Sequence, residues 1–290
     1  MIQHSELIIN SDGSIFHLHL KPENISENII LLGDPDRVDT VASYFDKIEF
    51  TLQNREFKTV TGWFNRKRIT VISTGIGTDN IDIVLNELDA LVNIDLETRT
   101  IKKKHTSLSI VRIGTSGGLQ ANLPVNSFVV SKKSVGFDGM LNFYANREDY
   151  CDVEFEKAFK KFTNWNKSLP TLYVVDASKS LLSKFFGPEF NLGVTISAPG
   201  FYGPQGRVLR LPLAVPELNQ QIEEFEFDGL KIANFEMESS AIYGLSRMLG
   251  HEALTVCLII ANRISLKANE NYRGEMHKLI KEVLVKLTSE

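Results

Sequence analysis

The sequence predicts an α/β fold, a three-layer α/β/α sandwich in which a mixed, twisted central sheet lies between two layers of helices. Three observations favour it. Apolar runs rich in β-branched residues alternate along the chain with segments of helical periodicity. Several of these runs lack polar alternation, as strands buried on both faces do. The 43% hydrophobic content of 290 residues can fill one large core, so we expect a single domain over residues 1–290.

The expected strands and helices follow from the period of the apolar residues. Strands are predicted at residues 29–32, 69–73, 108–113, 128–131, 172–175, 194–196 and 254–261. Helices are predicted at residues 35–45, 80–92, 153–165, 180–186, 238–249 and 272–287. The first helix has a clear start, because Asp34 can cap it, Pro35 suits its first turn and Asp36 lies near the positive end of its dipole.

The charge and cysteine content limit the class of partner. With 32 basic and 36 acidic residues, the net charge of −4 gives no long-range field for nucleic acid or a membrane surface, so small molecules are the expected partners. The apolar stretch 253–261 is too short to span a bilayer, and the N-terminus lacks a secretory pattern. Cys151 and Cys257 suit neither a disulfide framework nor a tetrahedral metal site. We therefore expect a cytoplasmic protein.

The most informative stretch is residues 114–118, Gly-Thr-Ser-Gly-Gly, directly behind the predicted strand 108–113. Its small residues predict a turn with exposed backbone N–H groups, and Arg112 stands two residues before it, so the segment can hold an oxyanion. Alternatively, such a turn only reverses the chain. The sequence has no P-loop motif and no complete dinucleotide fingerprint, so neither a nucleoside triphosphate nor a nicotinamide cofactor is indicated.

A second segment, Gly33-Asp-Pro-Asp-Arg37, ends a predicted strand and starts a helix. Together with Arg112 and Thr115 it could form a cradle for one phosphate, because a helix start offers unpaired N–H groups and a guanidinium can grip two oxygens at once. Alternatively, Arg37 pairs only with Asp34 or with another nearby acid.

The segment Asn234-Phe-Glu-Met-Glu-Ser239 carries two carboxylates at the entry to a predicted helix. Glu238 suits the 2′ and 3′ hydroxyls of a ribose because a carboxylate accepts two hydrogen bonds, and Met237 offers a flexible apolar surface beneath the sugar. Alternatively, Glu236 and Glu238 only interact with the helix dipole.

The segment Phe201-Tyr-Gly-Pro-Gln-Gly-Arg207 combines an aromatic ring with polar groups in a predicted loop. Phe201 could stack on a planar ligand, while Gln205 and Arg207 present donors and one acceptor to a base edge. The carbonyl, N–H, carbonyl edge of uracil is complementary to that pair. Alternatively, this is an ordinary loop rich in glycine and proline.

Taken together, the motifs resemble the nucleoside phosphorylase family, and most closely its uridine phosphorylase branch. The resemblance runs in one order from about Phe16 to Arg263. The family implies a distinct set of residues for each part of the substrates: Gly33, Arg37, Arg112 and Thr115 for phosphate; Glu236, Met237 and Glu238 for ribose; Ser116, Gly117, Phe201, Gln205 and Arg207 for the base. Of these, Arg207, Gln205 and Arg112 are the expected catalytic residues, inorganic phosphate is a co-substrate, and no cofactor is implied.

The resemblance also implies an assembly, at least a homodimer, with the homohexamer of bacterial relatives as the larger alternative. His17 would reach the ribose of the neighbouring subunit and Arg55 would close on its phosphate. From the residues alone, His17 and His19 could share one face of a strand and bind a metal, but no further ligand cluster completes such a site, so we expect none.

The residues 259–263, Ile-Ile-Ala-Asn-Arg, favour a pyrimidine. Relatives that act on purines commonly have an aspartate there to protonate N7, whereas Arg263 suits a base whose charge collects on carbonyl oxygens. Ile260 would line the base pocket, and Arg263 would support Gln205 or a water. The alternatives are a purine nucleoside phosphorylase, a hydrolytic nucleosidase and a non-catalytic nucleoside-binding protein. Residues 78–80 differ from the pattern beside which some relatives bind a monovalent cation.

Overall fold

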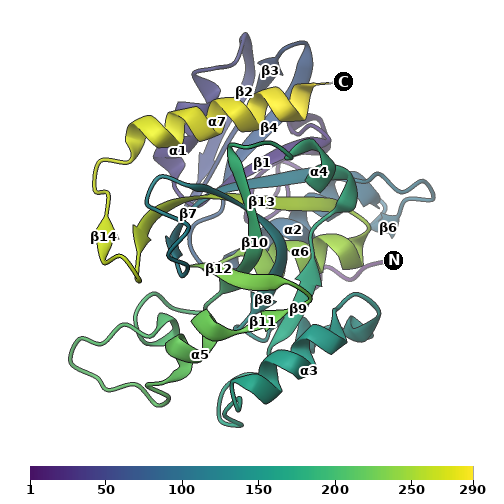
Figure 1. Ribbon diagram of the computed structural model, residues 1–290. Coiled ribbons are helices and arrows are strands. Elements are labelled where there is room, and N and C mark those ends of the chain that lie inside the picture. The colour runs from purple at the N-terminus through teal and green to yellow at the C-terminus, as the bar shows by residue number, and fades with distance from the viewer. Residues whose placement is uncertain (290) are drawn as a thin grey trace.

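The computed structural model describes residues 1–289, and its centre is a mixed sheet of 12 strands within these residues (Figure 1). From edge to edge the strands follow in the order β11 (Glu226–Phe227), β12 (Leu230–Glu236), β10 (Phe190–Ser197), β8 (Phe128–Gly136), β13 (Glu252–Asn262), β7 (Ser109–Gly118), β1 (Asn28–Leu32), β4 (Lys67–Ser73), β3 (Phe57–Phe64) and β2 (Lys47–Asn54). Two further strands, β9 (Tyr173–Asp176) and β14 (Lys267–Ala268), pair with β8 and β13.

The strand directions confirm the mixed sheet. β1 is parallel to β4 and β7, β7 is parallel to β13, and β10 is parallel to β8 and β12. β13 and β8 are antiparallel, and so are β2, β3 and β4. β12 also pairs with β7, where Phe235 lies opposite Gly117. The strands β7, β12, β10, β8 and β13 therefore form a closed ring within the sheet.

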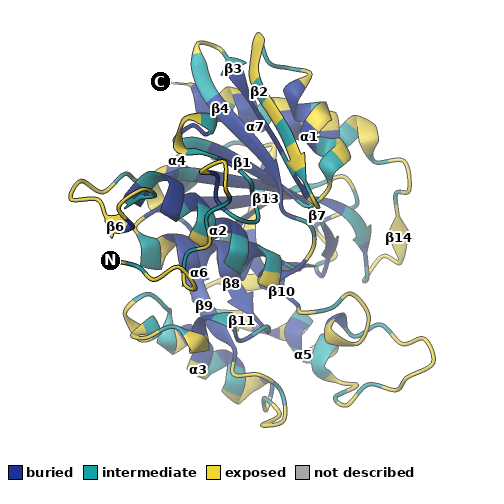
Figure 2. Ribbon diagram, turned by 180° about the vertical axis from the view of Figure 1, so that it is seen from behind, coloured by how far each residue is buried: buried dark blue, intermediate teal, exposed yellow. Residues whose placement is uncertain are grey.

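Helices cover both faces of the sheet. α1 (Pro35–Ala42) and α7 (Arg273–Thr288) lie on one face, and α2 (Thr78–Asn93) and α6 (Ser239–Leu249) pack together on the other (Figures 1 and 2). α3 (Val153–Phe162) and α5 (Leu218–Glu224) lie at the bottom of Figure 1, and α4 (Lys179–Lys184) lies higher and contacts β13. The start of α1 is as expected, since the Asp34 carboxylate accepts a hydrogen bond from the N–H of Asp36.

Residues 114–118 form the end of β7, so the prediction of a turn there was wrong. Their backbone pairs with β13 on one side, and Gly117 and Gly118 pair with β12 on the other. On that second side the pairing with β1 ends at Arg112 and the pairing with β12 begins at Gly117, so the sheet takes up only part of the N–H groups expected as a cradle. Gly114 serves a different purpose, because a Cβ at this position would collide with the guanidinium of Arg112, which folds back over it. The glycine makes room for the arginine.

The sequence analysis missed the hairpin of β2 and β3, the strand β12 and the helix α5. Residues 94–101, between α2 and β7, contain a small hairpin of β5 (Ile94–Asp95) and β6 (Thr100–Ile101). A second apolar cluster, rich in phenylalanine, lies beneath α3 and α5 and includes Phe155, Phe159 and Phe225. Among residues 1–289, no helix has the length and the apolar character that crossing a bilayer requires.

Candidate active site

A cavity of about 760 Å³ opens at the C-terminal ends of β1, β7, β12 and β13, where ligands bind in open α/β sheets. It is assembled from segments far apart in the sequence. Thirteen of the residues that the sequence predicted for the site line it: Gly33, Arg37, Arg112, Thr115, Ser116, Gly117, Phe201, Gln205, Arg207, Glu236, Met237, Glu238 and Ile260. Three others, His17, Arg55 and Arg263, do not line it.

The guanidinium of Arg37 lies at one end of the cavity, and some of its donors lack a hydrogen-bond partner. Nε and Nη1 of Arg37 are buried and lack a hydrogen-bond partner, and the nearest carboxylate, that of Asp34, is 3.9 Å from Nε. Burial and then the charge of Arg112 lower the pKa of Arg37. Because buried donors are almost always satisfied, this end of the cavity is built for an anion.

Arg112, on β7, is held by two carboxylates. Its guanidinium forms an ion pair with Glu238 and lies 3.2 Å from an oxygen of Glu236. Burial alone would lower the pKa of Arg112, but Glu238 and Glu236 outweigh it and raise the pKa. Nε of Arg112 is buried without a partner, so this arginine also retains an unused donor.

The two glutamates at the start of α6 do different work. The carboxylate of Glu236 accepts hydrogen bonds from the N–H groups of Glu238 and Ser239 at 2.9 and 3.0 Å, and from the hydroxyl of Ser197 at 2.5 Å. It therefore caps the helix, as the alternative interpretation expected for both acids. Glu238 accepts from the N–H of Gly77 at 2.8 Å, and burial raises its pKa although Arg112 lowers it.

The other end of the cavity presents a glutamine and an arginine joined to each other. Nη1 of Arg207 donates to Oε1 of Gln205 at 2.6 Å, and its guanidinium carbon lies 3.8 Å from the ring centroid of Phe201. Arg263 donates to the backbone carbonyl of Gln205, so it contacts the loop of residues 201–207 through the main chain. Burial, followed by the charge of Arg207, lowers the pKa of Arg263 to about 10.

Between the two ends, Ser116 belongs to a buried chain of hydrogen bonds. Its hydroxyl oxygen accepts from the amide of Asn234 at 2.8 Å, and the carbonyl of that amide accepts from the hydroxyl of Thr195 at 2.7 Å. Asn234 thus fixes Ser116 as a donor toward the cavity. Sequence reasoning assigned no role to Asn234, which the register of β12 against β7 places here, or to Gly77, which lies at the start of α2.

His17 and Arg55 lie together outside the cavity. The amide of Asn54 donates to the backbone carbonyl of His17 at 2.7 Å, and the guanidinium of Arg55 lies 5.7 Å from the ring centroid of Phe16. Nδ1 of His17 is 2.6 Å from the carboxylate of Glu87. The assignment of both side chains to the site of a neighbouring subunit stays a prediction.

The two histidines of the Ile15-Phe-His-Leu-His19 segment do not share a strand face. His19 has a left-handed backbone conformation and lies 3.2 Å from Asp12, while His17 is paired with Glu87. The interpretation of these residues as a strand was therefore wrong, because the segment turns. Their separate acidic partners leave no shared position for a metal ion.

One cluster in the described chain has the spacing of a metal site, and it lies at the opposite ends of the strands. Asp89, His105 and His251 approach one another there. Nδ1 of His251 accepts the N–H of Leu108 at 3.1 Å, while its buried Nε2 lies 3.3 Å from a carboxylate oxygen of Asp89 without a hydrogen bond.

The comparisons with known proteins agree with this geometry. The model of the phosphorylase superfamily matches residues 27–288, so the chain belongs to that family. The uridine phosphorylase of Escherichia coli K12 is 30% identical over 262 residues, which are 87% of this chain and 88% of the relative. A solved Trypanosoma brucei nucleoside phosphorylase that shows uridine phosphorylase activity has a TM-score of 0.89 at 29% identity, and covers 98% of this chain and 100% of its own.

A guanosine phosphorylase of Halorubrum lacusprofundi is 25% identical over 251 residues, 86% of this chain and 84% of the relative. The predicted fold and the predicted family are therefore confirmed, and the family contains relatives named for different bases.

Proposed function

We propose that the protein is a uridine phosphorylase, which converts uridine and inorganic phosphate reversibly into uracil and ribose 1-phosphate in pyrimidine nucleoside salvage. The observation that carries the proposal is one cavity with an arginine pair at one end and a glutamine and arginine pair at the other. The uridine phosphorylases among its relatives support the choice of substrate. Phosphate is a second substrate, and the reaction needs neither a metal nor a cofactor.

The arginine pair binds phosphate, and its arrangement couples phosphate to the sugar. Arg37 has free donors, whereas Arg112 is shared with Glu238. A bound phosphate draws part of the Arg112 guanidinium away, and the Glu238 carboxylate then accepts hydrogen bonds from the 2′ and 3′ hydroxyls of ribose. Met237 lies against the sugar, and Thr115 adds a hydroxyl to the phosphate end.

The glycosidic bond breaks without an enzyme nucleophile. A phosphate oxygen forms the new bond to C1′ while the C1′–N1 electron pair passes to the base, much as charge develops in glycoside hydrolysis. The negative charge collects on the uracil carbonyl oxygens, where Arg207 and the Nε2 group of Gln205 stabilise it. Each well-placed donor of this kind contributes roughly 3 kcal/mol to the transition state.

The late strand favours a pyrimidine. The side chain of Asn262 donates to the backbone carbonyls of Gln120 and Leu123 at 2.9 and 2.7 Å, so it is occupied in holding the chain. An amide in that position cannot protonate N7 of a purine. Arg263, through the carbonyl of Gln205, instead supports the loop that meets the carbonyl edge of uracil.

The decisive experiment measures base release from uridine, deoxyuridine, thymidine, cytidine, inosine and guanosine, each with and without phosphate. We expect phosphate-dependent release of uracil from uridine. Release without phosphate would identify a hydrolase, turnover of inosine or guanosine with inert uridine would identify a purine enzyme, and calorimetric binding of uridine without turnover would identify a nucleoside-binding protein.

A pair of variants tests the base end. Arg207→Ala should lower kcat by about a hundredfold or more, because it removes a donor that acts on developing charge. Lys103→Ala, at an exposed position, is the control and should leave kcat unchanged. Equal activity of the two variants on uridine would exclude this assignment.

We also propose that the active unit is at least a dimer, in which Arg55 and His17 complete the partner's cavity. Arg55→Ala and Arg112→Ala should each be nearly inactive. After the two are mixed, unfolded and refolded together, hybrid dimers should restore about a quarter of wild-type activity, because one site per hybrid is intact. Failure to restore activity would exclude shared sites.

We propose a cytoplasmic location, with which the free cysteines Cys151 and Cys257 agree.

A further inference from the structure

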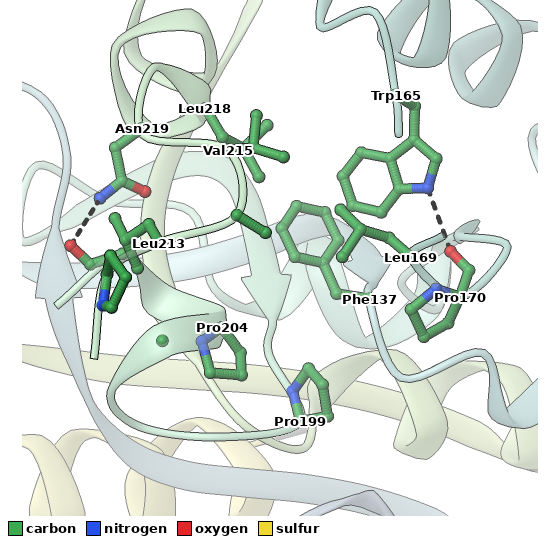
Figure 3. Close-up of a pocket in the computed structure, with 14 residues that line it drawn as sticks. Phe137, Trp165, Leu169, Pro170, Pro199, Pro204, Leu213, Val215, Leu218 and Asn219 are labelled. Carbon is green, nitrogen blue, oxygen red and sulfur yellow. Dashed lines mark hydrogen bonds between the residues drawn. The ribbon is translucent and has the colours of Figure 1, made fainter. Parts of the chain in front are cut away.

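A second cavity, of about 340 Å³, lies behind the loop that carries Gln205 (Figure 3). Its walls are flat and apolar. The rings of Phe137 and Trp165 lie 4.7 Å apart between centroids on one side, and Pro199 and Pro204 face the same space from the loop. Residues 212–215 and the start of α5 form the remaining side. Its size falls within the range of small-molecule sites.

The chemistry of the walls restricts what can bind. None of the lining residues within the described chain is charged, and the one polar side chain among them is that of Asn219. The amide of Asn219 donates to the backbone carbonyl of Gln205 at 3.2 Å, and the indole N–H of Trp165 donates to the carbonyl of Pro170 at 3.1 Å. An ion would therefore lose its hydration without compensation, whereas a flat uncharged ring would contact aromatic and proline faces.

The two cavities share one wall. Gly203, Pro204 and Gly206 line the apolar cavity, while Gln205, between them, lines the nucleoside cavity. Asn219 connects the walls of the apolar cavity, because its amide holds the loop carbonyls from α5. Residues 201–204 are exposed, and the loop is also held by hydrogen bonds from Arg263 and Arg207 to the backbone carbonyls of Gln205 and Phe201.

We propose that this apolar cavity is a second ligand site, which takes an uncharged, flat aromatic molecule of about two rings and whose occupation strengthens binding of the base at Gln205. Either ligand immobilises residues 203–206, so the second to bind loses less conformational entropy. The coupling to the base rests on the proposed function; the existence of the site does not.

The test uses 6-propionyl-2-dimethylaminonaphthalene, an uncharged, flat two-ring dye whose fluorescence brightens in apolar surroundings. The chain has two tryptophans, so Trp63→Phe leaves Trp165, in the cavity wall, as the energy donor to bound dye. We expect saturable energy transfer with a Kd below about 100 µM, as for a fragment-sized ligand in a formed pocket. Saturating uracil should tighten dye binding about fivefold, and by reciprocity the dye should tighten uracil binding by the same factor.

Two substitutions on the same loop locate the dye. Ala214→Phe adds a phenyl ring at the cavity wall and should weaken dye binding at least tenfold, whereas Val208→Phe, at an exposed position outside the cavity, should leave it unchanged. Equal dye affinity in the two variants, or no saturable binding, overturns the site. Unchanged dye affinity with bound uracil overturns the coupling. A chain that binds dye but neither binds nor cleaves uridine refutes the proposed function and leaves the second site standing.

Discussion

Arg37→Met should make the phosphate-free protein more stable while it removes phosphate binding. The Arg37 guanidinium is buried with two nitrogens that have no partner, and each such group costs about 1–3 kcal/mol. Its 3.9 Å approach to Asp34 returns less than about 1 kcal/mol. Methionine keeps an unbranched stem that reaches as far as Nε of arginine, and it has no N–H groups to satisfy. We therefore expect the free energy of unfolding without phosphate to rise by about 2 kcal/mol.

Urea unfolding with and without phosphate measures both effects. At a hundred times its Kd, phosphate should stabilise the wild type by about 2.7 kcal/mol and the Arg37→Met variant hardly at all. The kcat/KM of the Arg37→Met variant for phosphate should fall more than a hundredfold, as expected for the loss of a charge-assisted hydrogen-bonded pair. Arg210→Met, at an exposed position, is the matched control and should change neither property. A variant that is less stable than the wild type without phosphate, or that phosphate stabilises equally, would refute the reasoning.

Two further predictions concern neighbours of Arg112. Gly114→Ala places a methyl group against the Arg112 guanidinium, so it should lower the free energy of unfolding by about 1–3 kcal/mol and kcat/KM at least tenfold. The control is Gly274→Ala, whose Cβ meets open space and which should change neither quantity. Thermal unfolding and the uracil-release assay measure the two effects. Burial raises the pKa of the Cys257 thiol to about 12 from 9.0, so the unfolded chain loses this proton first and stability falls as pH rises above 9. At pH 10 the wild type should lose about 1.4 kcal/mol relative to Cys257→Ala, and equal pH profiles in urea would contradict it.

Local sequence signals were sufficient to predict a strand or helix where its own residues determine its structure. The unit of β1 and α1 has a continuous apolar strand, a capping aspartate and a proline at the first helical position, and the structure follows all three. β2 gave no such signal, because it is an edge strand with an exposed and mostly polar face. The prediction of a turn at residues 114–118 was wrong because it used only the local glycine content. Whether such a segment pairs as a strand depends on the neighbouring strands in the fold.

Most of the site could be predicted, but its internal bonds could not. The motif residues do line one cavity. Arg112 forms an ion pair with Glu238, and the Glu236 carboxylate caps α6. Both interactions depend on interatomic distances in the folded chain, which the spacing of residues in the sequence does not determine. The apolar cavity behind residues 203–206 was also invisible, since its walls come from α5, Trp165 and a loop without a motif.

The closed ring of strands separates two parts of the site whose residues can change at different rates in evolution; it consists of β7, β12, β10, β8 and β13. Arg112 and Glu236 belong to strands that are hydrogen-bonded to each other, so a change in either disturbs a shared framework. Residues 201–207, which we propose contact the base, lie outside the ring. Evolution can exchange them, and with them the preferred nucleobase, without rebuilding the anion end, which suits a family whose relatives include both uridine and guanosine phosphorylases.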